Sequence, residues 1–112
     1  MQEPRCESLA PDSGDRRDVT CIFTASGNTQ HASFGIRFLG SHDDTQLSMT
    51  PALNGQPLTC GPGSRTSSRF EDGEITLECR FPLQAKADSR QLLEVEIVWT
   101  HAQYDGFEFA VR

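Results

Sequence analysis

The sequence has 112 residues, a formal net charge of −6 and 36% hydrophobic residues. This length suits one domain with a modest core. The acidic balance disfavours nucleic acid and anionic membrane surfaces as partners, because both require basic patches. No apolar run is long enough for a membrane-spanning helix. We therefore expect residues 1–112 to form a single domain that binds no nucleic acid and does not insert into a membrane.

The chain contains four cysteines, Cys6, Cys21, Cys60 and Cys79. An even number of cysteines in a short chain without a CxxC motif is typical of disulfides rather than of metal or redox sites. The sequential pairing Cys6–Cys21 and Cys60–Cys79 closes two modest loops and is preferred. The alternative, Cys21–Cys79 with Cys6–Cys60, would bridge two sheets and stays open.

Disulfides persist mainly outside the cytoplasm. The chain opens on the polar residues 1–5 rather than on an apolar leader. We therefore expect a periplasmic or secreted protein whose signal peptide has been removed, with Met1 as an added residue.

Apolar residues recur with a period of two along most of the chain, which is the pattern of strands with one buried face. Short alternating runs separated by turn residues favour an antiparallel β-sandwich of about eight or nine strands. The sequence thus predicts an all-β fold, immunoglobulin-like in architecture but not necessarily in topology. The clearest runs are 19–24, 34–39, 75–81, 93–100 and 107–111.

Turn dipeptides at 54–55 (Asn-Gly) and 72–73 (Asp-Gly) predict two-residue hairpin loops, because such loops require positive φ at both central residues. Each register places apolar residues together on one face. In the second hairpin, Thr66 is predicted to lie opposite Cys79.

A third hairpin is predicted around the last Asp-Gly dipeptide. A two-residue loop would put the flanking apolar residues on opposite faces, so we prefer the three-residue loop 104–106. That loop places Trp99 opposite Val111. It also points His101 inward beside Phe109.

Catalytic and metal-binding signals are weak. Residues 42–44 (His-Asp-Asp) offer metal-binding donors but lack the spacing of a calcium loop. Glu94 and Glu96 lie about 6.6 Å apart on one strand face, near a glycosidase spacing, but they alternate with core residues and are expected to face solvent. We therefore expect no catalytic residue, no metal and no cofactor.

Exposed loops are the better candidates, because loops on a rigid sandwich often carry recognition. One is the Gly/Pro-stiffened loop after Cys60, with its two following arginines, and another is the tip of the last predicted hairpin, where an aromatic residue could anchor a partner. The binding residues expected from the sequence are Gly61, Pro62, Gly63, Ser64, Arg65, Arg69, Tyr104 and Asp105.

These observations favour a non-catalytic, extracytoplasmic protein-binding domain. Within that class we expect a small bacterial inhibitor or immunity-type protein that uses disulfide-supported loops, with a partner that is basic because the chain is acidic. The alternative is an adhesion or surface-assembly module that pairs through an edge strand. A carbohydrate or lipid carrier is a weaker alternative, because the chain has one Tyr and one Trp.

Overall fold

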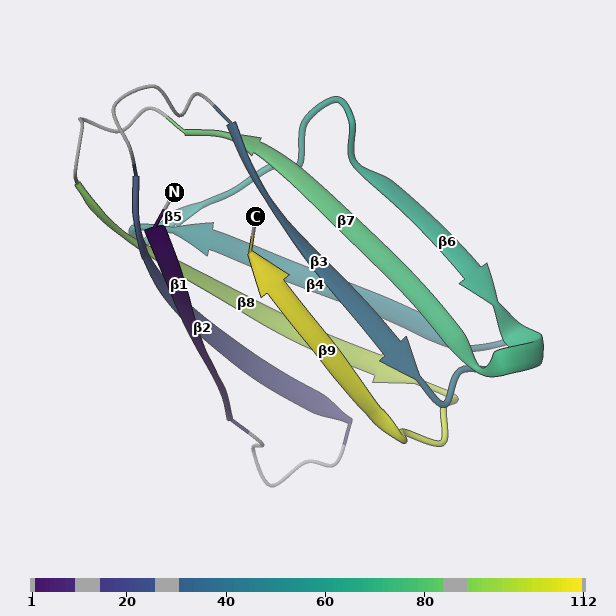
Figure 1. The fold of residues 1–112 in the computed structure, drawn as a ribbon. Coiled ribbons are helices and arrows are strands. Elements are labelled where there is room, and N and C mark those ends of the chain that lie inside the picture. Colours follow the sequence, from purple (N-terminus) through teal and green to yellow (C-terminus); the bar gives the residue numbers. More distant parts are fainter. Residues whose placement is uncertain (1, 10–14, 26–30, 84–88, 112) are drawn as a thin grey trace.

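The computed structural model describes residues 2–9, 15–25, 31–83 and 89–111. Two antiparallel sheets pack face to face, as Figure 1 shows. One sheet has the strand order β1-β2-β8-β4-β5 and the other has the order β6-β7-β3-β9. The predicted all-β sandwich is confirmed.

The elements follow one another along the chain as nine strands and one short 3₁₀ helix within the described ranges. They are β1 (Gln2–Leu9), β2 (Arg16–Thr24), β3 (His31–Leu39), β4 (Gln46–Leu53), β5 (Gln56–Pro57), β6 (Arg65–Arg69), η1 (Phe70–Asp72), β7 (Glu74–Pro82), β8 (Arg90–Thr100) and β9 (Gly106–Val111).

The core lies between the sheets and consists of the alternate residues that the sequence pattern selects. The strongest alternation runs along β8, where every second residue from Gln91 to Trp99 is buried. The largest fully buried side chains are Phe23, Phe34, Phe38, Phe81, Ile36, Leu93 and Ile97.

Both disulfides have the sequential pairing, Cys6–Cys21 and Cys60–Cys79. Cys6 and Cys21 lie directly opposite each other on neighbouring strands β1 and β2. The crossed pairing is therefore wrong: each bridge joins segments close in sequence and neither spans the two sheets. Among the residues that the structure describes, no helix is long and apolar enough to cross a bilayer.

The hairpin predicted at 54–55 is confirmed. Asn54 and Gly55 have φ values of 52° and 80°, as a type I′ turn requires. Leu53 pairs with Gln56 on the flanking strands. The Asn54 side chain also ties the turn to β8, because its Oδ1 accepts the Leu92 N–H at 2.9 Å.

The register predicted for the 72–73 turn is wrong by two residues. Thr66 lies opposite Leu77, not Cys79. The cause is η1: residues 70–72 form a 3₁₀ turn, and Gly73 in the left-handed region donates its N–H to the Phe70 carbonyl. The loop is thus longer than two residues, and because the shift is even, the side chains of β6 and β7 keep their predicted faces. Phe70 lies in the turn itself and is exposed.

The third predicted hairpin is wrong. β8 and β9 belong to different sheets, and β9 pairs with β3. Val111 therefore lies opposite Phe34 rather than Trp99. His101 has a φ of 56° and is exposed, not packed inward beside Phe109. Inward phenylalanines satisfy the alternation in either sheet, so the register test could not detect the crossing.

The crossing from β8 to β9 is held by the backbone around Gly40. Its carbonyl accepts the Gln103 N–H at 2.9 Å, and its N–H donates to the Gly73 carbonyl at 2.8 Å. The Asp105 N–H donates to the Leu39 carbonyl. Gly40 has a φ of 102°, and a Cβ there would lie 1.8 Å from the Gln103 carbonyl oxygen. Three loops therefore meet at a point where only glycine fits.

Replacing Gly40 by alanine should lower the free energy of unfolding by about 3 kcal/mol or more, because a backbone clash adds to a left-handed conformation. The matched control is Gly55→Ala, with a φ of 80° but no atom within 4 Å of the new Cβ, which should cost about 1 kcal/mol. Urea denaturation measures both. Equal losses would contradict the role assigned to Gly40.

Candidate functional site

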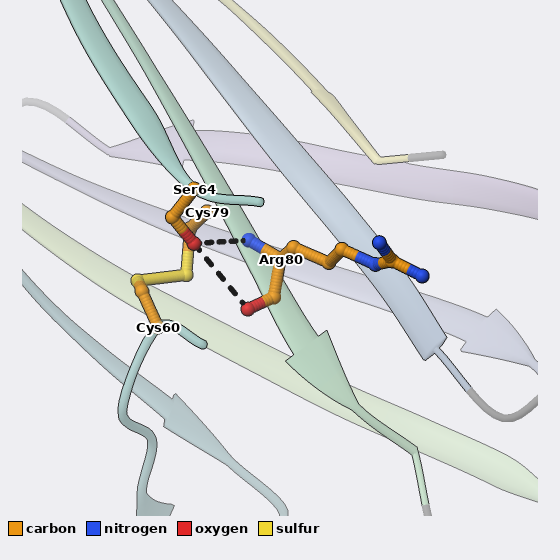
Figure 2. Close-up of a disulfide and its surroundings, with 4 residues drawn as sticks. All are labelled: Cys60, Ser64, Cys79 and Arg80. Carbon is orange, nitrogen blue, oxygen red and sulfur yellow. Dashed lines mark hydrogen bonds between the residues drawn. A yellow bond between two sulfur atoms is a disulfide. The ribbon is translucent and has the colours of Figure 1, made fainter. Parts of the chain in front are cut away.

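The loop Gly61–Arg65, named here the clamped loop, is fastened to β7 at Arg80 (Figure 2). The Gly61 N–H donates to the Arg80 carbonyl at 2.7 Å, and the Arg80 N–H donates to the Ser64 Oγ at 2.9 Å. The Ser64 N–H closes a turn onto the Gly61 carbonyl at 3.2 Å. The clamped loop therefore continues the hydrogen bonding along the edge of β7 beyond Glu78, where the pairing with β6 ends.

A disulfide adds a covalent anchor beside these hydrogen bonds. Cys60 precedes the clamped loop and is bonded to Cys79, which is fully buried. Gly63, with a φ of 92°, lets the Arg80 side chain pack against the loop: a Cβ there would lie 3.1 Å from the Arg80 Cδ. The loop is thus pre-organised, with Pro62 and Gly63 exposed at its tip.

The clamped loop carries positive charge on an acidic protein. The Arg65 side chain is 78% exposed and lies 3.5 Å from a Glu78 carboxylate oxygen. Arg80 is also exposed, and no carboxylate within the described ranges forms an ion pair with it. Arg80 was not among the residues expected from the sequence. The alternation after buried Cys79 points it outward, but only the structure shows that it lies under the loop.

The other expected binding residues do not join the clamped loop. Arg69 pairs with Glu74 at the opposite end of β6 and β7, about 20 Å from Arg80 along the strand. Asp105 also lies at that end, because it follows the crossing over Gly40. The sequence-predicted residues therefore form two separate groups at opposite ends of the sandwich.

Tyr104 covers the end of the core. Its ring is half-buried and stacks on Trp99, with ring centroids 4.7 Å apart. It also lies 5.7 Å from the Phe38 ring, and the Arg17 guanidinium lies 5.2 Å from its centroid. Tyr104 is therefore packed rather than projecting as a free anchor. A role in binding stays a prediction.

Ion pairs organise the outer face of the sheet that contains β7. Arg37 lies 3.2 Å from Glu74 and 3.4 Å from Glu108. The hydrogen bond and charge of Arg37 lower the pKa of Glu74, while desolvation opposes the shift. A hydrogen bond from Thr76 and the charge of Arg69 lower it further. Glu74 is thus held in its charged form on this face.

Of the residues considered for chemistry, Glu94 and Glu96 are neighbours on the outer face of β8, and His42 lies in a separate turn. Glu94 is exposed, and Glu96 lies 2.9 Å from Arg16 on the outer face of the sheet that contains β8. His42 is exposed, and its N–H donates to the Thr45 hydroxyl in a local turn. In the part of the chain that is described, no group of three or more His, Cys, Asp or Glu residues is arranged to hold a metal ion.

No protein-family model matches the chain, and no curated protein matches it. Among solved structures, a selenomethionine-labelled β-glucosidase from Kluyveromyces marxianus is similar, with 17% sequence identity and a TM-score of 0.46. The match covers 87% of this chain but only 11% of the glucosidase chain. A resemblance this distant carries no argument about function.

The hydrogen bond from Arg80 to Ser64 can be tested by amide exchange. Ser64→Ala should speed exchange of the Arg80 amide and lower stability by about 1 kcal/mol, because that N–H loses its acceptor. Ser67→Ala, on exposed β6, is the matched control and should leave that amide unchanged. Hydrogen exchange followed by NMR measures both, and an unaltered Arg80 amide in Ser64→Ala would refute the clamp.

Arg37→Gln should raise the pKa of Glu74, as measured by NMR titration of its carboxyl carbon. Because the pKa of Glu74 is lowered in the folded state, its stabilising effect is present above the unfolded-state pKa and is lost as pH falls through the folded-state pKa. Arg65→Gln, which removes the partner of Glu78, is the control and should not move Glu74. A Glu74 pKa that does not respond to Arg37→Gln would contradict the assignment.

Proposed function

We propose that this chain is a non-catalytic, extracytoplasmic protein-binding domain that uses the clamped loop to contact its partner. The single observation that supports the proposal is the pre-organisation of Gly61–Arg65 by Arg80 and by the Cys60–Cys79 disulfide. A loop already held in one conformation loses little entropy on binding, so more of the contact energy appears as affinity.

The local charge at the clamped loop says more about the partner than the net charge of the whole chain does. The arginines at positions 65 and 80 suit carboxylates on the contacting surface of a partner, since guanidinium groups pair with carboxylates in a fixed fork geometry. The net charge of −6 still favours approach to a partner that is basic overall, over distances of about a Debye length. An inhibitor or immunity-type protein that blocks a basic secreted enzyme fits both features.

An extracytoplasmic location is part of the proposal. Both disulfides stabilise segments next to exposed surface, and such bridges endure in oxidising compartments. A reducing cytoplasm would open them and release the clamped loop from Cys79. The periplasm or the extracellular medium is therefore the setting in which this loop stays ordered.

Binding should be measured by calorimetry against a panel of purified, basic secreted hydrolases: a muramidase, a ribonuclease and a serine protease. We expect one of them to bind and its activity to fall on binding. Arg80→Glu should weaken that binding about tenfold or more, because it reverses the unpaired charge at the loop.

Arg90→Glu is the matched control, since Arg90 is also exposed but lies on the other sheet. It makes the same change in net charge, so it should alter affinity far less than Arg80→Glu. Equal losses in the two variants would show that only overall charge matters. Failure of every hydrolase to bind would count against an inhibitor.

A further inference from the structure

One side of the sandwich, between β1 and β9, is open. β1 ends one sheet and β9 ends the other, so each strand presents a backbone edge that no strand of the described chain pairs with. The two strands approach each other across the opening, as the purple and yellow arrows in Figure 1 show. Unpaired strand edges are the usual points at which another strand adds.

The apolar residues at this opening are incompletely covered. Cys6 is exposed although its disulfide partner Cys21 is fully buried. Phe107 and Phe109 point between the sheets yet remain half-exposed. Together they border a groove of about 350 Å³. The groove is lined by Cys6, Glu7, Ser8, Arg17, Val19, Tyr104, Phe107 and Phe109.

Arg17 places a positive charge at one end of this groove. It alternates with Val19 and Cys21 on β2, so it points toward the inside of the sandwich and is half-buried there. Its guanidinium lies over the Tyr104 ring. Arg16 and Arg37 each pair with two carboxylates, whereas none of the carboxylates in the described segments pairs with Arg17.

The one carboxylate in the lining does not neutralise this charge. Glu7 lies opposite Thr20, on the outward-facing side of β2, because Val19 and Cys21 on either side of Thr20 are buried. Its side chain therefore points to the outer face of the sheet. A half-buried guanidinium that forms no ion pair within the described segments and lies beside apolar rings favours a carboxylate ligand.

We propose that this groove binds an extended segment of a partner protein, which adds as a strand to β9 and places a carboxylate on Arg17. The inference rests on the protein-binding role proposed above but uses a different surface. An extended peptide fits both features, since the edge supplies main-chain hydrogen bonds and the groove receives alternate side chains. A small carboxylate ligand would leave the edge unused.

β9 is the better edge of the two. It pairs with β3 in an unbroken register from Gly106 to Val111. β1 carries Pro4, which has no N–H to donate, and its register shifts between Gln2 and Arg5. Proline and irregular register are features that protect an edge from pairing.

The geometry sets the sequence pattern of the partner. Phe107 and Phe109 lie about 6.8 Å apart on the inward side of β9, so a paired strand would present two apolar side chains at positions i and i+2. Tyr104, under the Arg17 guanidinium, precedes Gly106 at the start of β9. A partner antiparallel to β9 would therefore carry its Asp or Glu on the C-terminal side of the apolar pair.

The test is selection of a displayed peptide library on the full, disulfide-bonded chain. We expect a consensus of alternating apolar residues with one Asp or Glu, synthesised afterwards as a labelled peptide for affinity measurement. Arg17→Gln should weaken that peptide about tenfold or more. Arg16→Gln, which alters the neighbouring arginine on the outer face, is the matched control and should leave affinity unchanged.

A second arm tests strand addition without changing the protein. The selected peptide is remade with N-methyl groups at alternate backbone nitrogens, in both possible phases. One phase should abolish binding and the other should not, because only one set of N–H groups faces β9. Binding that survives both phases would overturn the proposal.

Other outcomes would also overturn it. These are no enrichment, a consensus indifferent to Arg17→Gln, saturable binding of octanoate in place of peptide, or a dimer in sedimentation that occupies the groove with a second copy. Peptides that lose affinity with Arg80→Glu but not with Arg17→Gln would support the clamped loop and reject the groove. The two proposals can therefore fail separately.

Discussion

The hydrogen bonds around Gly40 hold the crossing that takes the chain from β8 in one sheet to β9 in the other. Gly40 joins the end of β3 to Gly73 and to Gln103, so the chain leaving β8 crosses the end of the sandwich instead of turning back. β9 then adds to β3 rather than to β8. β8 is already paired on both sides, with β2 and β4, so β9 cannot form a hairpin with it. The crossing brings β9 to β3 instead and places Tyr104 over Trp99.

The two disulfides lie at the edges of the sandwich. Cys6 fastens the edge strand β1 to β2, and Cys60 fastens the start of the clamped loop to β7. Both surfaces proposed for binding thus lie next to a covalent bridge. The bridges hold edges that have few buried side chains of their own, since every described residue of β6 is exposed.

Much of the fold could be predicted from the sequence, because a period of two reports directly which residues face the core. The Asn54-Gly55 turn follows from an equally local rule. The sequential disulfide pairing was preferred because it closes two modest loops, but the crossed pairing stayed open until the structure excluded it. The path of β9 could not be predicted, since Phe107 and Phe109 face inward in either sheet. Of the candidate site, the Gly61–Ser64 loop was recognisable by its composition. Arg80 and Arg17 were missed because their roles depend on neighbours distant in sequence.

The strand order has a consequence for the rate of folding. The central pairings join segments far apart in sequence: Val19 lies opposite Val95, and Phe38 lies opposite Ile75. Such pairings lose the entropy of closing large loops before the strand contacts form and offset that loss. Folding should therefore be slow, on the order of milliseconds to seconds. Both disulfides join residues that are near each other in sequence, 15 and 19 residues apart. Formation of the disulfides therefore helps the edge segments to reach their partner strands. The central strands must pair without any covalent link.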